Sequence, residues 1–284
     1  MKVHTNFDLT PFNSYRIKAT CRTAYFPETE ADVVSFYQNN KAYVLLGSGH
    51  NVILSKLYYD TSFLIFNGNY SDVSINSDGM LVAEAGITML RLSELALENS
   101  LSGLEIFYDI PSSLGGAVVM NAGASGEEIK DVLLKVRFLD LVDMQVKEIR
   151  KEDMNFEYRN SFFQRNTDKV VLKVWLQLLH KEKNLIKEKM ETIKVQRWAK
   201  QPKEFPNAGS VFKRPNGFYV GAMIDELNLK GFTIGGAQIS KKHGGFIVNI
   251  GEATGKDILD IISEVKRLVL QKFGVELEVE QRVI

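Results

Sequence analysis

Small residues dominate one segment of the sequence, and this segment limits what the chain can fold into. It covers residues 110–126 and reads IPSSLGGAVVMNAGASG. Glycine in such quantity costs chain entropy on folding, so this density needs a reason. Two explanations fit. Another part of the chain packs closely against the segment, or a ligand approaches its backbone at places where bulky side chains would block access.

A second glycine-containing segment, Gly47-Ser48-Gly49-His50-Asn51, follows a short apolar run over residues 42–46. Such a run ending in glycines predicts a buried strand that leads into a tight loop. Glycine permits positive φ, so consecutive backbone N–H groups can converge on an anion, and Ser48 and Asn51 add side-chain donors. The segment is not a G-x-G-x-x-G motif, because residue 52 is valine. A simple strand–loop turn remains the alternative.

The charge balance favours a small ligand over a polyanionic partner. The sequence has 35 basic and 35 acidic residues, which cancel. It therefore lacks the excess of positive charge typical of proteins that bind duplex nucleic acid or anionic membranes. Two donor-rich segments without a cationic cluster suit a dinucleotide whose charge is neutralised by backbone dipoles. The single cysteine, Cys21, excludes an internal disulfide.

No segment reads as a targeting or membrane-spanning sequence. The first residues, MKVHTNFD, lack the apolar region of a signal peptide. The longest apolar stretch covers residues 170–179 and is interrupted by Lys173 and Gln177. It is about half as long as the roughly 20 residues that a membrane span needs. We therefore expect a cytoplasmic protein.

Helix and strand patterns are both present, which predicts an α+β protein. Apolar residues at helical spacing, and Thr88 as an N-cap, favour helices in four places. The helices are expected over residues 30–40, 88–99 and 183–200, and in a C-terminal segment carrying Ile258, Ile262, Val265 and Val269, with Gly274 just past its end. Strands are expected over residues 42–46, 62–66, 81–85, 132–141, 169–179 and 245–249.

Several ordered motifs resemble the UDP-N-acetylenolpyruvoylglucosamine reductase family, and they cover nearly the whole chain. The two glycine segments, within LLGSGHNVILS and IPSSLGGAVVMNAGASG, are similar to the FAD-binding lobes of that family. The other similar stretches are NSYRI at 13–17, YRNSFF at 158–163, NAGSVFKRP at 207–215, GGAQISKKHGGFIVN at 235–249 and FGVELEVEQRVI at 273–284. Only a short distance separates Arg159 from Ser210, which resembles the family's shorter type.

The resemblance implies a two-lobed FAD-binding domain of the PCMH/VAO type, followed by a smaller α/β substrate-binding domain. The implied boundaries are 1–68 and 69–185 for the two FAD-binding lobes and 186–284 for the substrate domain. NADPH would reduce a non-covalently bound FAD, and reduced FAD would pass hydride from N5 to the enolpyruvyl group of a UDP-sugar. The resemblance thus implies a monomer with a UDP-sugar substrate and NADPH as partners.

Residues of the matching motifs are the candidate ligand contacts. The implied FAD contacts are Gly47, Ser48, Gly49, His50, Asn51, Ile110, Pro111, Ser112, Ser113, Gly115, Gly116, Asn121, Ala122 and Ala124. The implied substrate contacts are Tyr158, Lys213, Arg214, Lys241 and Asn249, with Lys242 as an alternative to Lys241. His243 is either a ligand contact or a hydrogen-bonded core histidine, and we favour the second. No His, Cys and Asp cluster has metal-ligand spacing, so we expect no metal.

Three residues carry the implied chemistry. Hydride addition to an enol ether that bears a carboxylate creates negative charge and then requires a proton. Arg159 can stabilise the charge through bidentate bonds to a carboxylate. Ser210 can supply the proton, and Glu280, in a closed site, can hydrogen-bond the substrate carboxylate. The competing explanations are a structural arginine, a turn serine, and a solvated pair of glutamates in which Glu278 rivals Glu280.

The sequence also departs from the family pattern. Asp109 and Ser112 stand where glycines are usual, Arg214 replaces an asparagine, and Val279 and Gln281 flank Glu280 in place of proline and valine. These differences keep two alternatives open. One is an FAD-dependent oxidoreductase of the same superfamily with another small-molecule substrate. The other is a nucleotide-binding module without catalysis.

Overall fold

The computed structural model describes residues 1–284, and the chain divides into two compact units. The first unit consists of Met1–His4, Ala24–Ser48 and Ser62–Gln196. The second consists of Thr5–Thr23, Gly49–Thr61 and Arg197–Ile284. The sequence-based division into three parts, with boundaries after residues 68 and 185, remains a prediction.

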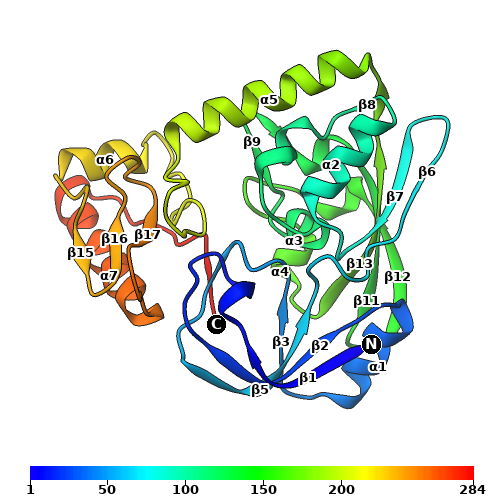
Figure 1. Cartoon of the computed structure of the whole chain (residues 1–284), viewed down its shortest axis with the longest axis horizontal. Coiled ribbons are helices and arrows are strands. Elements are labelled where there is room, and N and C mark those ends of the chain that lie inside the picture. The colour runs from blue at the N-terminus through cyan, green and yellow to red at the C-terminus, as the bar shows by residue number, and fades with distance from the viewer. The chain divides into compact units, whose positions relative to one another are not determined.

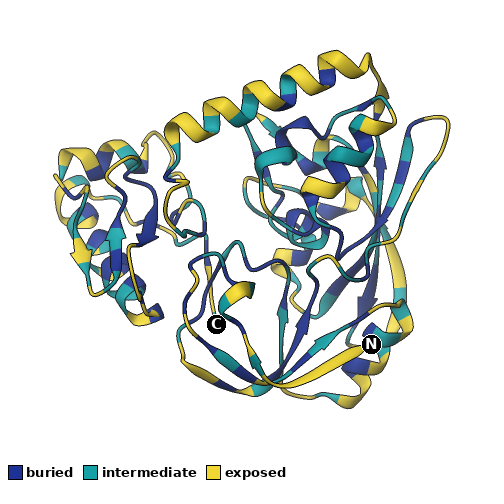
Figure 2. Ribbon diagram, viewed as in Figure 1, coloured by how far each residue is buried: buried dark blue, intermediate teal, exposed yellow.

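A five-stranded antiparallel sheet forms the centre of the first unit, with strand order β12-β11-β13-β7-β6. Its central strand β13 is buried along most of its length, whereas the edge strand β12 is largely exposed (Figure 2). Buried apolar residues on β13 confirm the covered sheet that the sequence predicts. The strands are β6 (Val73–Ile75), β7 (Met80–Glu84), β11 (Leu133–Asp140), β12 (Gln145–Arg150) and β13 (Lys169–Gln177).

Helices α3 and α4 pack on β13, and α2 lies beside them (Figure 1). Thr88 caps α2 as predicted, because its side chain accepts a hydrogen bond from the backbone N–H of Arg91. The prediction of a helix over residues 183–200 is also confirmed. The helices that begin in this unit are α1 (Glu30–Asn39), α2 (Met89–Glu98), α3 (Leu114–Val119), α4 (Phe162–Arg165) and α5 (Lys183–Lys200).

A four-stranded sheet has the order β1-β2-β5-β3. Strands β3 and β5 run parallel, with Tyr43 opposite Ser62 and Leu46 opposite Ile65. The sequence predicts β3 and the second half of β5, but neither β1 nor β2, whose exposed residues break the apolar pattern. The strands are β1 (Lys2–Asp8), β2 (Thr20–Phe26), β3 (Tyr43–Leu46) and β5 (Tyr58–Ile65).

In the second unit, a three-stranded antiparallel sheet of order β15-β16-β17 packs against the long helix α7. Buried Ile258, Ile262, Val265 and Val269 line one face of α7, and Gly274 ends it in a left-handed conformation, both as predicted. The elements are α6 (Val220–Glu226), β15 (Thr233–Ile234), β16 (Ala237–Ile239), β17 (Ile247–Asn249) and α7 (Gly255–Phe273).

Short pairings complete the two units. Strand β18 near the C-terminus runs parallel to β4 in the second unit, so the end of the chain is tied to the segment after Asn51. The short strands are β4 (Val52–Ile53), β8 (Leu101–Ser102), β9 (Gly123–Ala124), β10 (Glu127–Glu128), β14 (Leu179–His180) and β18 (Arg282–Val283). The 3-10 helices are η1 (Thr10–Phe12), η2 (Glu105–Asp109), η3 (Ile129–Asp131) and η4 (Lys151–Met154). None of the helices combines the length and apolar character that crossing a bilayer requires.

Candidate functional site

The small-residue segment 110–126 contains a loop, the short helix α3 and a turn that leads into β9. Its first part is held against the chain after β7, because the N–H of Gly115 donates to the carbonyl of Ala85 at 2.9 Å and that of Leu114 to Ile87 at 2.8 Å. A Cβ added to Gly115 would lie 3.1 Å from the Cβ of Ala85. Close packing therefore accounts for this glycine.

Ser112 and Ser113 give this segment a polar character that packing does not explain. The Ser112 hydroxyl is buried and has no hydrogen-bond partner in the protein. A buried unsatisfied hydroxyl costs stability, so it indicates a missing polar partner such as a bound ligand. Ser113 caps α3 by accepting from the N–H of Gly116, and a Cβ added to Gly47 would lie 2.7 Å from the Ser113 oxygen. Parts of both predicted flavin segments thus meet in the first unit.

The other predicted flavin contacts in this segment differ in exposure. Asn121 is fully buried, in the left-handed region, and its side-chain amide donates to Glu128 at 3.0 Å and to the carbonyl of Glu157 at 2.9 Å. Its side chain thus holds the segment in place. Pro111 is exposed, and the half-buried positions are Ile110, Gly116, Ala122 and Ala124.

Arg159 lies against this same segment. Its guanidinium donates to the carbonyl of Gly123 at 2.7 Å and to that of Asn121 at 3.4 Å, and it lies 4.0 Å from the carboxylate of Glu128. The side chain is 19% exposed, and the backbone of Arg159 is left-handed, with φ of 53°. Strain of this kind persists where the surrounding structure holds it. The structure therefore brings the predicted catalytic arginine to the predicted flavin segment.

Ser161 explains how the YRNS motif is anchored. Its hydroxyl donates to the carbonyl of Val119 at 2.7 Å, at the end of α3, and also caps α4. Tyr158 is half exposed, and its ring centre lies 5.0 Å from the Arg159 guanidinium. A fixed serine thus docks the motif while the tyrosine ring remains accessible, which is compatible with its predicted contact to substrate.

The loop at 47–51 makes close backbone contacts of its own. Gly49 has φ of 71°, and any Cβ there would overlap the backbone carbonyl of Phe12. Its own carbonyl accepts from the N–H of Ser14 at 3.0 Å. Glycine is therefore required at 49 for packing as well as for backbone conformation. Ser48, also predicted as a flavin contact, is buried.

His50 is the residue of this loop with a buried polar atom that lacks a hydrogen-bond partner in the protein. Burial and, to a smaller extent, the positive charges of Arg16 and Lys203 lower the pKa of His50 to about 4. The imidazole is therefore neutral near pH 7, and its buried Nδ1 has no hydrogen-bond partner in the protein. Such an atom is available to a polar ligand.

Asn51 connects this loop to the C-terminal strand. Its side-chain amide donates to the carbonyl of Glu280 at 3.1 Å, and its own carbonyl accepts from the N–H of Arg282 at 3.0 Å. The sequence suggests a donor to an anion at this position. In the structure, the Asn51 side chain positions the backbone of a predicted catalytic residue.

Ser210 and Glu280 are near neighbours in the second unit. The Val211–Lys213 segment pairs with residues 278–280 across the bridge between Phe212 and Val279, and the N–H of Glu280 donates to the carbonyl of Val211 at 2.9 Å. This antiparallel register puts Ser210 opposite Gln281. Ser210 also forms a bridge with Phe246, and it is exposed, whereas Glu280 is half-buried.

The two rival glutamates have different surroundings. Glu278 is 68% exposed, and its carboxylate accepts from the ammonium of Lys213 at 2.6 Å. Lys213, a predicted substrate contact, is thus paired with Glu278 in this structure. The next residue, Arg214, stacks its guanidinium over the ring of Tyr219 at 3.8 Å. This pair forms a flat, exposed cationic surface in the second unit.

The remaining predicted contacts lie on β17 and the loop before it. Asn249 is 7% exposed and uses three of its four hydrogen-bonding positions, with the carbonyl of Tyr15 and the N–H groups of Gly251 and Ala253. Lys241 is exposed, whereas the ammonium of Lys242 donates to the carbonyl of Trp198 at 2.8 Å.

His243 is half-buried and hydrogen-bonded, and its choice between a ligand contact and a core histidine remains a prediction. Its Nδ1 accepts from the N–H of Gly245 at 3.1 Å, and its ring packs edge-on against Phe246. Burial lowers its pKa, so the ring acts as a neutral acceptor.

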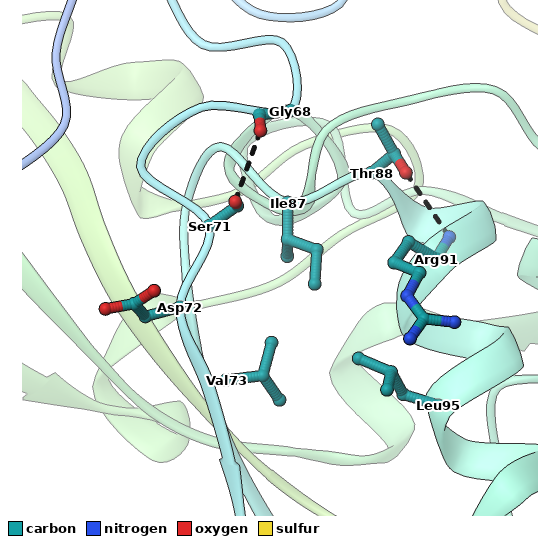
Figure 3. A pocket seen from close by; sticks show the side chains of 8 residues that line it. All are labelled: Gly68, Ser71, Asp72, Val73, Ile87, Thr88, Arg91 and Leu95. Carbon is teal, nitrogen blue, oxygen red and sulfur yellow. Dashed lines mark hydrogen bonds between the residues drawn. The ribbon is translucent and has the colours of Figure 1, made fainter.

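A pocket of about 330 Å³ lies in the first unit (Figure 3). Apolar Val73, Ile87 and Leu95 line it together with polar residues, and none of the predicted site residues is among them. Arg91 reaches its rim, but the guanidinium is paired with Glu98 at 3.0 Å and Glu94 at 3.5 Å. The pocket therefore offers no uncommitted cation, and we assign it no role in the chemistry.

Sequence reasoning missed residues that hold the site rather than react in it. These are Tyr15, Glu128, Ser161 and Gln281. Tyr15, Ser161 and Gln281 lie within the quoted motifs, but their partners lie far away in the sequence, so the motifs do not reveal these roles. No group of three or more His, Cys, Asp or Glu side chains is arranged to hold a metal ion.

Comparisons with known proteins match both units of the chain. A family model described as "UDP-N-acetylenolpyruvoylglucosamine reductase, C-terminal domain" matches residues 201–284, and a model described as "FAD binding domain" matches residues 23–149. The UDP-N-acetylenolpyruvoylglucosamine reductase of Francisella tularensis is 42% identical over 97% of this chain and 98% of its own length. That of Syntrophomonas wolfei is 38% identical over 100% and 95%.

A solved structure shows the same fold. The crystal structure of the UDP-N-acetylenolpyruvylglucosamine reductase from Thermus caldophilus superposes with a TM-score of 0.83 at 29% identity. The match covers 99% of this chain and 98% of that one.

Proposed function

The chain belongs to the UDP-N-acetylenolpyruvoylglucosamine reductase family, and we propose that it reduces UDP-N-acetylglucosamine enolpyruvate to UDP-N-acetylmuramate with NADPH. It is an FAD-dependent oxidoreductase of peptidoglycan precursor synthesis. The observation that carries the proposal is identity of 42% along almost the full length of a named reductase.

The residues of the two glycine segments suit a bound FAD. The unpartnered Ser112 hydroxyl and the unpartnered Nδ1 of His50 offer hydrogen-bonding atoms. A bulky residue at Gly47 would crowd Ser113. When bound there, FAD would supply the hydride for the reduction, with NADPH as its reductant. We assign the flavin contacts to the two segments named from the sequence. The flavin is assigned as bound without a covalent bond.

We assign charge stabilisation to Arg159. Hydride addition to the enolpyruvyl double bond leaves negative charge delocalised over the adjacent carboxylate, and a guanidinium binds a carboxylate through two parallel N–H bonds. The bonds from Arg159 to the carbonyls of Asn121 and Gly123 support this role, since they orient the guanidinium at the flavin segment. Tyr158 beside it is assigned as a substrate contact.

We assign proton donation to Ser210. The carbon next to the site of hydride addition must receive a proton to complete the reduction, and a hydroxyl can donate it to a strongly basic carbanion. Support comes from the exposure of Ser210 beside Gly209, a residue without a side chain that would hinder an approaching substrate.

We assign the contact with the substrate carboxylate to Glu280 rather than to Glu278. Glu278 is paired with Lys213 and mostly exposed, which suits a role in holding that lysine. Glu280 is half-buried, and both its backbone N–H and its carbonyl are held. Lys213, Arg214 and Lys241 are assigned to the UDP part of the substrate, and Asn249 is assigned as a polar substrate contact. The monomeric state and the cytoplasmic location remain predictions.

A purified-protein assay tests the function. The protein should be yellow, should oxidise NADPH rapidly only when UDP-N-acetylglucosamine enolpyruvate is present, and should form a product heavier than the substrate by two hydrogens. A yellow protein that does not reduce this substrate would indicate an oxidoreductase that acts on another molecule. A colourless protein that takes up no flavin would indicate a binding module without catalysis.

A further inference from the structure

One buried amide in the second unit contacts the turn that carries Ser210. Gln281 is 4% exposed, and its Nε2 donates to the carbonyl of Ala208 at 3.0 Å. The same nitrogen lies 3.4 Å from the carbonyl oxygens of Gly209 and of Ser210. A single side chain therefore engages three consecutive carbonyls of the turn.

Tyr15 fixes the orientation of this amide. Carbonyls only accept hydrogen bonds, so the NH₂ group of Gln281 must face the turn and its oxygen must face away. That oxygen accepts from the hydroxyl of Tyr15 at 2.9 Å. Tyr15 is completely buried, and burial raises its pKa, so the phenol keeps its proton and remains a donor. If the amide flipped, it would lose the bonds at both ends.

The turn is held on one side by the bridge between Ser210 and Phe246, and its open position is Gly209. Gly209 has φ of 79°, and no other atoms lie within 4 Å of where its Cβ would be. A glycine in open space permits many backbone conformations. Its N–H donates to the side chain of Asn207 at 3.1 Å, and the N–H of Val211 donates to the carbonyl of Gly245 at 3.0 Å. Gln281 holds the carbonyl side and stands opposite Ser210 in the strand register.

We propose that Gln281, oriented by Tyr15, is a positioning residue for the proton-donating hydroxyl of Ser210. This inference rests on the proposed function, since it assumes that Ser210 gives the proton. The amide does not contact the substrate. It fixes the backbone of Ala208–Ser210, and thereby the place from which the Ser210 oxygen acts. Because catalytic groups are sensitive to displacements near 1 Å, a loosened turn lowers the rate without abolishing folding.

The experiment separates the two half-reactions of the holoenzyme in rapid mixing without oxygen. Gln281→Met keeps the approximate shape of the side chain and removes the donors. We expect NADPH to bleach its flavin as fast as in the unchanged protein. Recovery of the flavin colour on mixing with UDP-N-acetylglucosamine enolpyruvate should be slower by about 10-fold or more, in the range that misplaced catalytic groups produce. Tyr15→Phe, which frees the amide to flip, should slow the same step by a few-fold.

A double variant distinguishes positioning from general stabilisation. If Gln281 acts through Ser210, Gln281→Met should slow the reaction little further in a Ser210→Ala background, because the hydroxyl it positions is gone. Thr254→Ala is the control. It removes the N-cap of α7 in the same unit, whose bond runs to the N–H of Asp257 instead of the turn. We expect it to lower stability and to leave flavin recovery in the folded protein unchanged.

The inference is overturned if Gln281→Met recovers its flavin colour at the unchanged rate. It is also overturned if the fold-decreases in rate caused by Gln281→Met and by Ser210→Ala multiply in the double variant. If Gln281→Met does not fold, the test rests on Tyr15→Phe. The inference is then contradicted if Tyr15→Phe slows both half-reactions equally or slows neither of them. If the unchanged protein shows no recovery with this substrate, the proposed function fails instead. The two failures are thus distinguishable.

Discussion

At the scale of single residues, Glu278 and Glu280 provide a matched pair for mutagenesis. They have the same chemistry and are two positions apart, but Glu278 is paired with Lys213, whereas Glu280 is half-buried and anchored through its backbone. We expect Glu280→Gln to reduce kcat by about 10²-fold or more, as the loss of a transition-state contact does. Glu278→Gln should mainly raise KM, because Lys213, an assigned substrate contact, loses the carboxylate that holds it in place. Steady-state kinetics of both variants check this, and a greater loss of kcat in Glu278→Gln would reverse the assignment.

Arg159 is both a predicted catalytic group and a contact of the flavin segment. Arg159→Ala should keep FAD and lose turnover by about 10²- to 10³-fold, because the developing charge loses its partner. Arg159→Lys keeps the charge without the planar pair of donors, so we expect it to restore only part of the rate. Flavin content after gel filtration, measured beside kcat, separates the roles. Loss of FAD with normal turnover in the remaining holoenzyme would show a structural arginine.

The residues that support the site could not be predicted from the sequence. Motif order suffices to name Arg159 and Ser210, because their functional types stand in recognisable surroundings. Gln281 is visible in the sequence only as a departure from valine, and its role depends on Tyr15, 266 positions away. Asn51 is similar, because its side chain is bonded to Glu280 and not directed at an anion. Long-range partners of this kind arise from tertiary packing, which no local pattern encodes.

At the scale of elements, those with a clear apolar period were predictable. Helix α7 has a regular apolar face and a glycine at its end, and α5 and α2 also follow the expected ranges. Strands β1 and β2 were missed because their exposed residues break the alternation. Helix α3 was missed because two glycines stand near its start, and glycine normally argues against a helix. Packing on β13 overrides that preference.

The N-terminus of α7 allows a test of element stability. Thr254 accepts from the N–H of Asp257 at 3.2 Å, and Asp257 accepts from the N–H of Thr254 at 2.9 Å, which forms a capping box. Thr254→Ala should lower the free energy of unfolding by about 1 kcal/mol, while Thr254→Ser should retain it. Denaturant titration measures both, and kcat should be unchanged in each. Equal stability of the alanine and serine variants would contradict the role of the cap.

At the scale of the whole molecule, His50 links stability to pH. Its pKa is about 4 in the folded protein, below the value of about 6.5 expected when unfolded. The unfolded chain therefore binds the proton first. The contribution of neutral His50 to the free energy of unfolding is fully present above about pH 6.5. It declines as the pH falls and is lost near pH 4. The full effect of this one group is about 3 kcal/mol.

Denaturant midpoints measured between about pH 7.5 and pH 4.5 check this dependence. Carboxylates also contribute to acid sensitivity, so the comparison with His50→Gln isolates the histidine. We expect the variant to lose stability less steeply over that range. Parallel curves for the two proteins would show that His50 is not held neutral by burial.

The proton step from Ser210 is the centre of the proposed reaction, and a single turnover tests it most directly. Ser210→Ala and the unchanged protein are each reduced with one equivalent of NADPH without oxygen and then mixed with UDP-N-acetylglucosamine enolpyruvate. Both should bleach at the same rate. Flavin colour should then return with product in the unchanged protein and about 10²- to 10⁴-fold more slowly in Ser210→Ala, the range of general acid catalysis. Equally fast recovery with normal product in both would show that Ser210 does not donate the proton.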